Sequence, residues 1–137
     1  MGIQCYNNIS EAVKILFKMD TPNSSYVIGV VDEEQFVGHV YYGSKLNDYN
    51  VAHILRIDES PFFPTKNNRD RASFMDSFPM EYPGEGLGDY RESCIAVETI
   101  DGCRELSISY YSHKIYNGKP KLEGLPASFG NEDQCTT

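Results

Sequence analysis

The sequence contains no tryptophan, no pair of cysteines at C-x-x-C spacing and no long apolar run. Its four cysteines stand far apart and no histidine lies near them at ligand spacing, so no zinc site and no other metal site is predicted. A membrane-spanning helix needs about 20 consecutive apolar residues, and none is present. The N-terminus lacks a basic segment followed by an apolar run, so we expect no signal peptide. Reduced thiols in a cytoplasmic protein fit these absences.

Basic charge is also scarce, because 12 Lys and Arg face 20 Asp and Glu, for a net charge of −8. Proteins that bind nucleic acids cluster their basic residues on one surface, and this sequence has no such cluster. We therefore expect neither a nucleic-acid partner nor a membrane partner. The length of 137 residues suits one domain with its own apolar core.

The first 43 residues alternate in the manner of β-strands. Residues 13–19, VKILFKM, have a period of two that places Lys14 and Lys18 on the wet face of a half-buried strand. Turn residues follow, and residues 25–31, SYVIGVV, are typical of a buried strand. Residues 35–43, QFVGHVYYG, are predicted to be its hairpin partner. We expect three strands in this part of the chain.

The middle of the chain is more polar and rich in turn residues. Residues 51–58, VAHILRID, are predicted to form a short strand. Residues 60–74, SPFFPTKNNRDRASF, are predicted to be a long ordered loop, and loops of that length in a compact domain are usually functional or disordered. Residues 81–93, EYPGEGLGDYRES, are predicted to be a turn-rich connector.

The strongest hairpin pattern joins SCIAVETI, residues 93–100, to ELSISYYSHKIY, residues 105–116, through Asp101-Gly102. Asp-Gly supplies the positive φ angles that tight hairpin turns need. No segment has a convincing period of 3.6. The sequence predicts an all-β fold, most simply an antiparallel β-sandwich.

Several motifs that suggest chemistry fail on spacing. The glycines of GEGLGDY, residues 84–90, lack the preceding strand and following helix of a dinucleotide loop. GKP at 118–120 lacks the Walker spacing, and Pro120 removes an amide that such a loop needs. The three histidines are far apart and suggest no catalytic triad. Acidic pairs such as Asp58 with Glu59 are expected to be solvated.

One group of charged and aromatic side chains in the long loop suits a polyhydroxyl ligand, because charged groups bond hydroxyls and rings cover a sugar face. A local salt bridge that pins the loop is the simpler alternative on these residues alone. The residues are Asp58, Arg69, Asp70 and Arg71, with Phe62, Phe63 and Phe74.

Together, VGHVYYG, RID, DRASFMD, MEYPGEGLGDYRES and SHKIYNGKPKLEGLPAS resemble the start of bacterial α-galactosidases of glycoside hydrolase family 36. The resemblance runs from about Tyr26 onward, and the last of these motifs is the most specific. Departures are mild; Ser93, for example, stands where the family usually has Pro. The resemblance implies the N-terminal β-sandwich domain, or the first part of it, of a longer enzyme whose catalytic (β/α)8 barrel is absent from this chain.

The resembled family consists of retaining enzymes that remove terminal α-galactose from sugars such as melibiose and raffinose, without a cofactor. It implies a tetramer in which this domain reaches a neighbour's active site, with Asp58 and Arg71 as substrate-binding residues and Phe62 and Phe63 at the rim. We expect no catalytic residue in this chain and no hydrolysis by it alone. A free-standing carbohydrate-binding β-sandwich module is the alternative.

Overall fold

The structure is a computed structural model. It describes residues 2–7, 9, 13–31, 35–48, 50–55, 78–86, 90–116, 118, 123–124 and 126.

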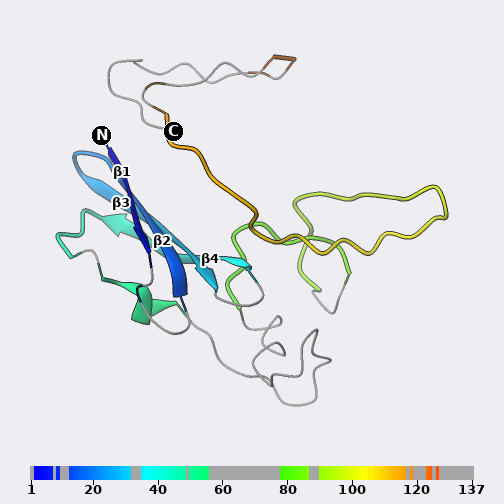
Figure 1. The fold of residues 1–137 in the computed structure, drawn as a ribbon, viewed down its shortest axis with the longest axis horizontal. Coiled ribbons are helices and arrows are strands. Elements are labelled where there is room, and N and C mark those ends of the chain that lie inside the picture. The colour runs from blue at the N-terminus through cyan, green and yellow to red at the C-terminus, as the bar shows by residue number, and fades with distance from the viewer. Residues whose placement is uncertain are drawn as a thin grey trace.

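Four antiparallel strands form one sheet in the order β1-β2-β3-β4 (Figure 1). They are β1 (Gly2–Asn7), β2 (Val13–Asp20), β3 (Ser24–Val31) and β4 (Val37–Ser44). Each strand pairs with the next along the chain, so the sheet is a simple meander. The three strands predicted within residues 13–43 are confirmed, and so is the all-β antiparallel class.

Strand β1 is a correction to the expected three strands. Its sequence, GIQCYN, shows no clean alternation, and its residues are exposed or half-buried. It forms because it pairs with the edge of β2 from Gly2↔Asp20 to Asn7↔Ile15. Cross-strand pairing of this kind is a tertiary effect that the local pattern does not encode.

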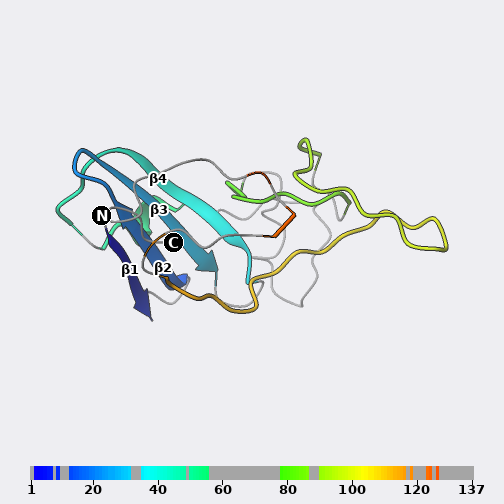
Figure 2. The same ribbon diagram turned by 90° about the horizontal axis from the view of Figure 1, so that it is seen from above.

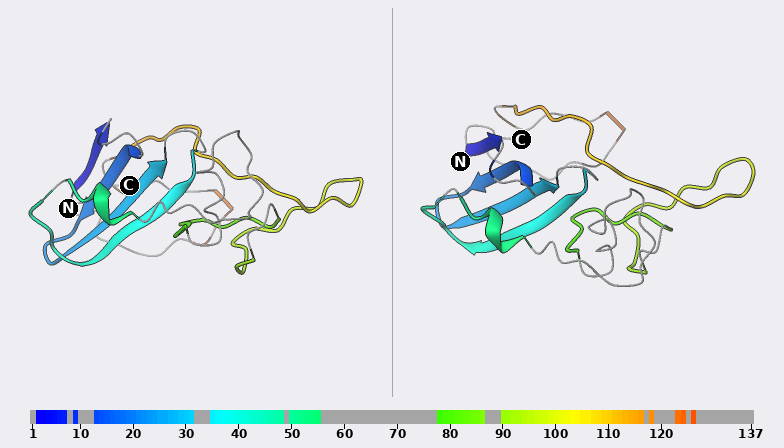
Figure 3. Two further views of the ribbon diagram at one scale, coloured as in Figure 1. Left: turned by 90° about the horizontal axis from the view of Figure 1, so that it is seen from below. Right: turned by 60° about the horizontal axis from the view of Figure 1, so that its bottom comes forward.

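Apolar side chains cover both faces of the sheet. Alternate residues of a strand point to opposite faces, so neighbouring residues such as Leu16 and Phe17 belong to two different clusters. On one face β2, β3 and β4 pack against the 3-10 turn η1 (Ala52–Ile54), Leu55 and Phe78. On the other face Phe17 and Val30 pack near Tyr110. Figure 3 shows η1 on one side of the sheet and residues 106–116 on the other.

Lys18 corrects the predicted wet face of β2, because this lysine is buried rather than solvated. Its Nζ lies 2.6 Å from Asp20 Oδ2. Ser25 donates a 2.5 Å hydrogen bond to Asp20 Oδ1 and accepts one from the Leu46 backbone. Burial by itself raises the pKa of Asp20, but the hydrogen bonds from Lys18 and Ser25, together with the positive charges of Lys18 and Lys45, outweigh it and lower that pKa.

Residues 51–55 are a further correction, since Ala52–Ile54 form the 3-10 turn η1 instead of a strand. The rest of the predicted strand, residues 56–58, lies outside the described residues. Val51, Ala52 and Leu55 are buried against the sheet while His53 and Ile54 are exposed. A single 3-10 turn places these apolar side chains on the sheet without a strand partner. This explains why residues 51–55 form a turn and not a strand.

The predicted hairpin at residues 93–116 is correct in its turn and wrong in its strands. Gly102 has a φ of 77°, and Thr99 N donates to Cys103 O at 2.9 Å. Apart from the bridge between Ile95 and Gly84, the described residues of both arms lie outside any strand ladder. Figure 2 shows the hairpin reaching away from the sheet. An isolated pair of strands is marginal without a third partner, which accounts for the missing ladder.

The substitution Asp20→Asn is expected to lower the free energy of unfolding by about 3 kcal/mol at pH 7, because it leaves the buried Lys18 charge unpaired. The folded-state pKa of Asp20 is lowered, so its contribution is full above the ordinary value of 3.8 and disappears as the pH falls through the folded-state value. Urea unfolding between pH 2 and 7 measures both effects. The double variant Lys18→Met, Asp20→Asn should regain much of the loss; an Asp20→Asn chain as stable as the parent at pH 7 would contradict this account.

Candidate functional site

The four residues predicted to bind sugar, Asp58, Phe62, Phe63 and Arg71, lie outside the described residues. Their positions and contacts therefore remain predictions. The structure does describe the residues that flank them, Leu55 before and Phe78 after.

Both flanking residues converge on one point of the sheet, the backbone of Gly38 in β4. A Cβ at Gly38 would lie 2.6 Å from Phe78 Cζ and 2.8 Å from Leu55 Cδ1. Phe78 is fully buried and Leu55 nearly so. Only glycine leaves room there for both side chains, so β4 holds both ends of the segment 56–77 at one place.

The chain after Phe78 continues along the edge of β4. His39 N donates to Pro79 O at 2.7 Å, and Glu81 N donates to Val37 O at 2.8 Å. Gly38 and Met80 form an antiparallel bridge between these two bonds. The Arg91 guanidinium also donates to Phe78 O. Residues 79–81 thus cover the outer edge of the sheet, which leaves fewer backbone groups of β4 unpaired.

A cluster of polar side chains, Tyr26, His39 and Glu81, fixes the same attachment from the face of the sheet. Tyr26 donates its hydroxyl to Glu81 Oε1, and His39 Nδ1 lies 3.2 Å from Glu81 Oε2. The rings of Tyr26 and His39 have centroids 5.6 Å apart. Burial raises the pKa of Glu81 above its ordinary value.

This cluster joins three elements of the fold and is partly open to water. The side chains of His39 and Glu81 are 41% and 30% exposed. Tyr42, 71% exposed, meets Tyr26 edge to face with centroids 6.1 Å apart. A carboxylate, an imidazole and a phenol can each form hydrogen bonds with hydroxyl groups. In this cluster, however, Glu81 already bonds both Tyr26 and His39. The arrangement therefore acts first as an anchor for residues 79–81.

The sequence pattern does not predict this cluster. His39 and Glu81 are 42 positions apart, and neither lies in a recognisable catalytic motif. The local sequence gives one sign of the cluster, because two polar residues stand among apolar neighbours. They are His39 in VGHVYY and Glu81 in MEYP. Their meeting depends on the packing of Phe78, which the local pattern does not reveal.

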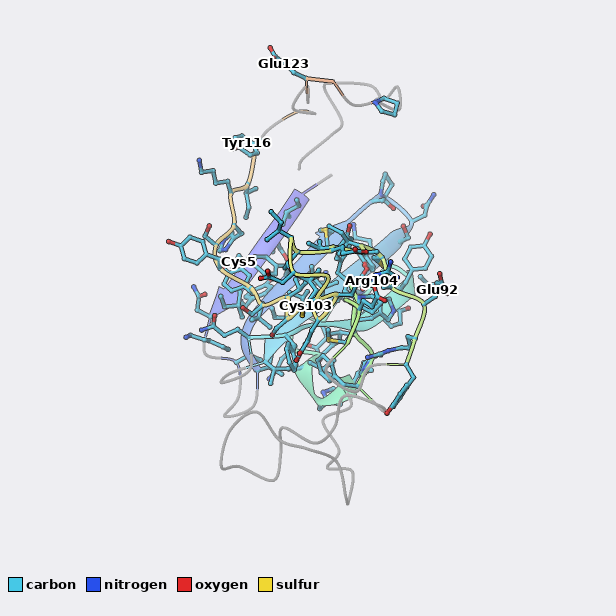
Figure 4. The ribbon with its side chains drawn as sticks, turned by 90° about the vertical axis from the view of Figure 1, so that its right-hand side faces the viewer. Cys5, Glu92, Cys103, Arg104, Tyr116 and Glu123 are labelled. Atoms are coloured by element: carbon cyan, nitrogen blue, oxygen red, sulfur yellow. The ribbon has the colours of Figure 1, made fainter. Side chains whose placement is uncertain are left out.

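The stretch that begins at His113 contacts the sheet at its start. The His113 ring meets Phe17 edge to face at 4.7 Å, and His113 Nδ1 lies 2.7 Å from the Tyr110 hydroxyl. Figure 4 shows Tyr116 and then Glu123 progressively farther from the sheet.

The described residues were searched for clusters of metal-binding side chains and for membrane-spanning helices. No group of three or more His, Cys, Asp or Glu side chains among the described residues is placed to hold a metal ion. In the same residues no helix has the length and apolar character needed to cross a bilayer.

Comparison with known proteins identifies relatives of this chain. The glycosyl hydrolase family 36 N-terminal domain family matches residues 35–137. The chain is 32% identical over 126 residues to the bifunctional α-galactosidase/sucrose kinase AgaSK of Mediterraneibacter gnavus, covering 90% of this chain and 13% of the relative. It is 32% identical over 119 residues to α-galactosidase Mel36A of Lactobacillus acidophilus, covering 86% and 16%. The chain spans between about an eighth and a sixth of the length of these relatives.

Solved structures show the same fold. The α-galactosidase AgaB of Geobacillus stearothermophilus superposes with a TM-score of 0.74 at 28% identity, over 97% of this chain and 17% of its own. A variant of α-galactosidase AgaA from the same organism, in complex with raffinose, superposes with a TM-score of 0.73 at 30% identity, over 86% and 16%.

The substitution Gly38→Ala is expected to lower the free energy of unfolding by about 1–3 kcal/mol, because the buried Phe78 ring and Leu55 have no space to withdraw. Gly43→Ala in the same strand is the matched control. A Cβ there meets the hydroxyl end of Tyr41, which reaches solvent more readily. Thermal or urea unfolding of both variants measures the difference. Equal stability of the two variants would show that Gly38 is not a packing constraint.

Glu81 is expected to make the attachment of residues 79–81 depend on pH. Because its folded-state pKa is raised, the attachment is strongest below the ordinary value of 4.5 and weakens as the pH rises through the raised value. Glu81→Gln keeps an acceptor for Tyr26 and removes the charge, so it should abolish this dependence. Amide exchange of His39 and Glu81, normalised to the unstructured rate at each pH, measures it. The exposed Glu92→Gln is the control, and a pH dependence that persists in Glu81→Gln would rule out this role.

Proposed function

The chain belongs to the glycosyl hydrolase family 36 N-terminal domain family, and from this membership we propose that it is the N-terminal domain, or the first part of it, of an α-galactosidase. The observation that carries the proposal is the superposition over most of this chain on α-galactosidases solved with raffinose and with stachyose. The catalytic barrel belongs to another part of the polypeptide in this proposal, because the chain corresponds to only 16% of those enzymes.

The reaction of the whole enzyme is hydrolysis of a terminal α-galactoside with retention of configuration. In such a mechanism one carboxylate attacks the anomeric carbon and a second carboxylic acid protonates the leaving oxygen. Both belong to the barrel in our proposal, so this chain supplies neither. Its free thiols Cys5, Cys94 and Cys103 fit a reducing compartment, and a cytoplasmic location is part of the proposal.

The role proposed for this chain is to line the substrate entrance and to support the assembly, a tetramer. We assign Asp58 and Arg71 to hydrogen bonds with sugar hydroxyls, and Phe62 and Phe63 to the rim of the entrance. Support comes from the sheet, since both ends of the segment that carries them are packed on Gly38. A segment with fixed ends presents its side chains at lower entropic cost than a free one.

The product of the whole gene should hydrolyse an aryl α-galactoside, and Asp58→Ala and Arg71→Ala should each lower kcat/KM about tenfold or more. The basis is that a hydrogen bond from a charged group contributes about 1.5–3 kcal/mol, and 1.4 kcal/mol is a factor of ten in rate. Steady-state kinetics with raffinose and with the aryl substrate separate effects on KM from effects on kcat.

Matched controls for these two variants stand beside them in the sequence. Glu59→Ala and Lys66→Ala remove a carboxylate and a cation from nearby positions and should leave kcat/KM within about twofold of the parent. Circular dichroism confirms that all four variants fold. Unchanged kinetics in Asp58→Ala and Arg71→Ala would reject the site assignment, whereas a gene product without any α-galactosidase activity would reject the proposed function itself.

A further inference from the structure

Strand β4 contains a β-bulge in its middle. Val27 of β3 pairs with Tyr41, whereas the next residue, Ile28, pairs with His39, so Val40 is an extra residue in β4. An extra residue reverses the alternation of side chains on the strand beyond it, because the side-chain period is two. Bulges are common next to active sites, where they re-aim a side chain.

The bulge places Tyr42 on the same face of the sheet as His39. Residues three apart lie on opposite faces of a regular strand. Here the Tyr26 ring contacts both side chains, with its centroid 5.6 Å from that of His39 and 6.1 Å from that of Tyr42. The bulge thus adds an aromatic ring to the cluster of Tyr26, His39 and Glu81.

The Tyr42 ring is exposed and yet held in one orientation. It is 71% exposed, and it meets the Tyr26 ring at an interplanar angle of 79°. The two residues pair directly across β3 and β4, and Tyr26 is itself fixed by the bond from its hydroxyl to Glu81. An aromatic side chain that is ordered before binding supplies contact area at a low cost in conformational entropy.

Polar groups with remaining hydrogen-bonding capacity border this ring. Within the described residues His39 bonds Glu81 through Nδ1, which leaves its second ring nitrogen, Nε2, for a hydroxyl group. An ionised Glu81 accepts about four hydrogen bonds, and its contacts with Tyr26 and His39 use a part of that capacity. Ser44, exposed and two residues beyond Tyr42, presents its hydroxyl on the same face. A ring face bordered by donors and acceptors matches a sugar, whose C–H groups are surrounded by hydroxyls.

We propose that Tyr42, with Tyr26, His39 and Glu81 beside it, forms a surface site for a neutral oligosaccharide, using none of the residues assigned above to the substrate entrance. The Tyr42 ring packs against the C–H groups of one sugar ring, while His39 Nε2 and Glu81 bond its hydroxyls. A neutral ligand fits because the carboxylate of Glu81 and the net charge of −8 repel anions. The choice of sugar rests on the proposed function, since related α-galactosidases were solved with raffinose and with stachyose.

Titration of the 137-residue chain with raffinose, followed by the NMR signals of Tyr26, His39 and Tyr42, tests the proposal. The shifts should saturate in the millimolar range, as expected for one ring and a few hydrogen bonds. Tyr42→Ala should weaken binding about tenfold or more, whereas Tyr42→Phe keeps the ring face and should stay within about threefold of the parent.

The control for this titration is Tyr111→Ala, which removes a tyrosine that is 95% exposed and lies outside the cluster. It should bind raffinose as the parent chain does. Signals that do not saturate, or a Tyr42→Ala chain that binds raffinose as tightly as the parent, would overturn the proposal.

A second measurement uses the whole gene product. Tetranitromethane nitrates accessible tyrosine rings, and peptide mass spectrometry gives the rate at each tyrosine. A sulfur-linked raffinose analogue, which resists hydrolysis, should slow nitration of Tyr42 in proportion to the fraction of sites occupied and leave the 90% exposed Tyr90 unchanged. A Tyr42 ring that is not nitrated without sugar is covered and overturns the proposal, as does nitration that the analogue does not slow. Neither measurement depends on hydrolysis, so a gene product without α-galactosidase activity would reject the proposed function and leave the sugar site to these results.

Discussion

The packing of Phe78 and Leu55 against the bare backbone of Gly38 connects three parts of the chain that are distant in sequence. The turn η1 lies on the sheet because Leu55 reaches this point, and residues 79–81 follow the edge of β4 because Phe78 does. A side chain at position 38 would displace both. The close approach of two buried residues to one glycine therefore brings together Leu55 and Phe78, which are 23 positions apart in the sequence.

Polar groups reinforce this arrangement at two separate places in the sheet. The buried Lys18 pairs with the half-buried Asp20, which also bonds Ser25, where β2 turns into β3, and Glu81 joins Tyr26 and His39 beside β4. The pKa of Asp20 is lowered by its partners, whereas the pKa of Glu81 is raised by burial. The first group thus favours the folded chain at neutral pH, and the second loosens its attachment as the pH rises. The two carboxylates differ because only Asp20 has a buried cation beside it.

Short-range patterns predicted much of the fold and part of the site. Period-two alternation correctly predicted β2, β3 and β4, and the Asp101-Gly102 pair correctly predicted the hairpin turn. The same reasoning missed β1, whose pairing with β2 is not written in its own pattern, and placed a strand where η1 forms. It treated Lys18 as solvated, because alternation does not show that Asp20 neutralises it. The assignment of Asp58 and Arg71 came from family resemblance and stays a prediction.

The sequence by itself determined the all-β class, the hydrophobic periodicity of the central strands and, through its motifs, membership of glycoside hydrolase family 36. These properties depend on residues close together in the chain, whose side-chain spacing fixes local conformation. Only the tertiary structure decided which distant residues meet: Leu55 with Phe78 at Gly38, and His39 with Glu81. These contacts between distant residues depend on the shape of the packed core. A single missing Cβ decides which side chains fit against a strand, and the local sequence pattern does not show which distant residues those are.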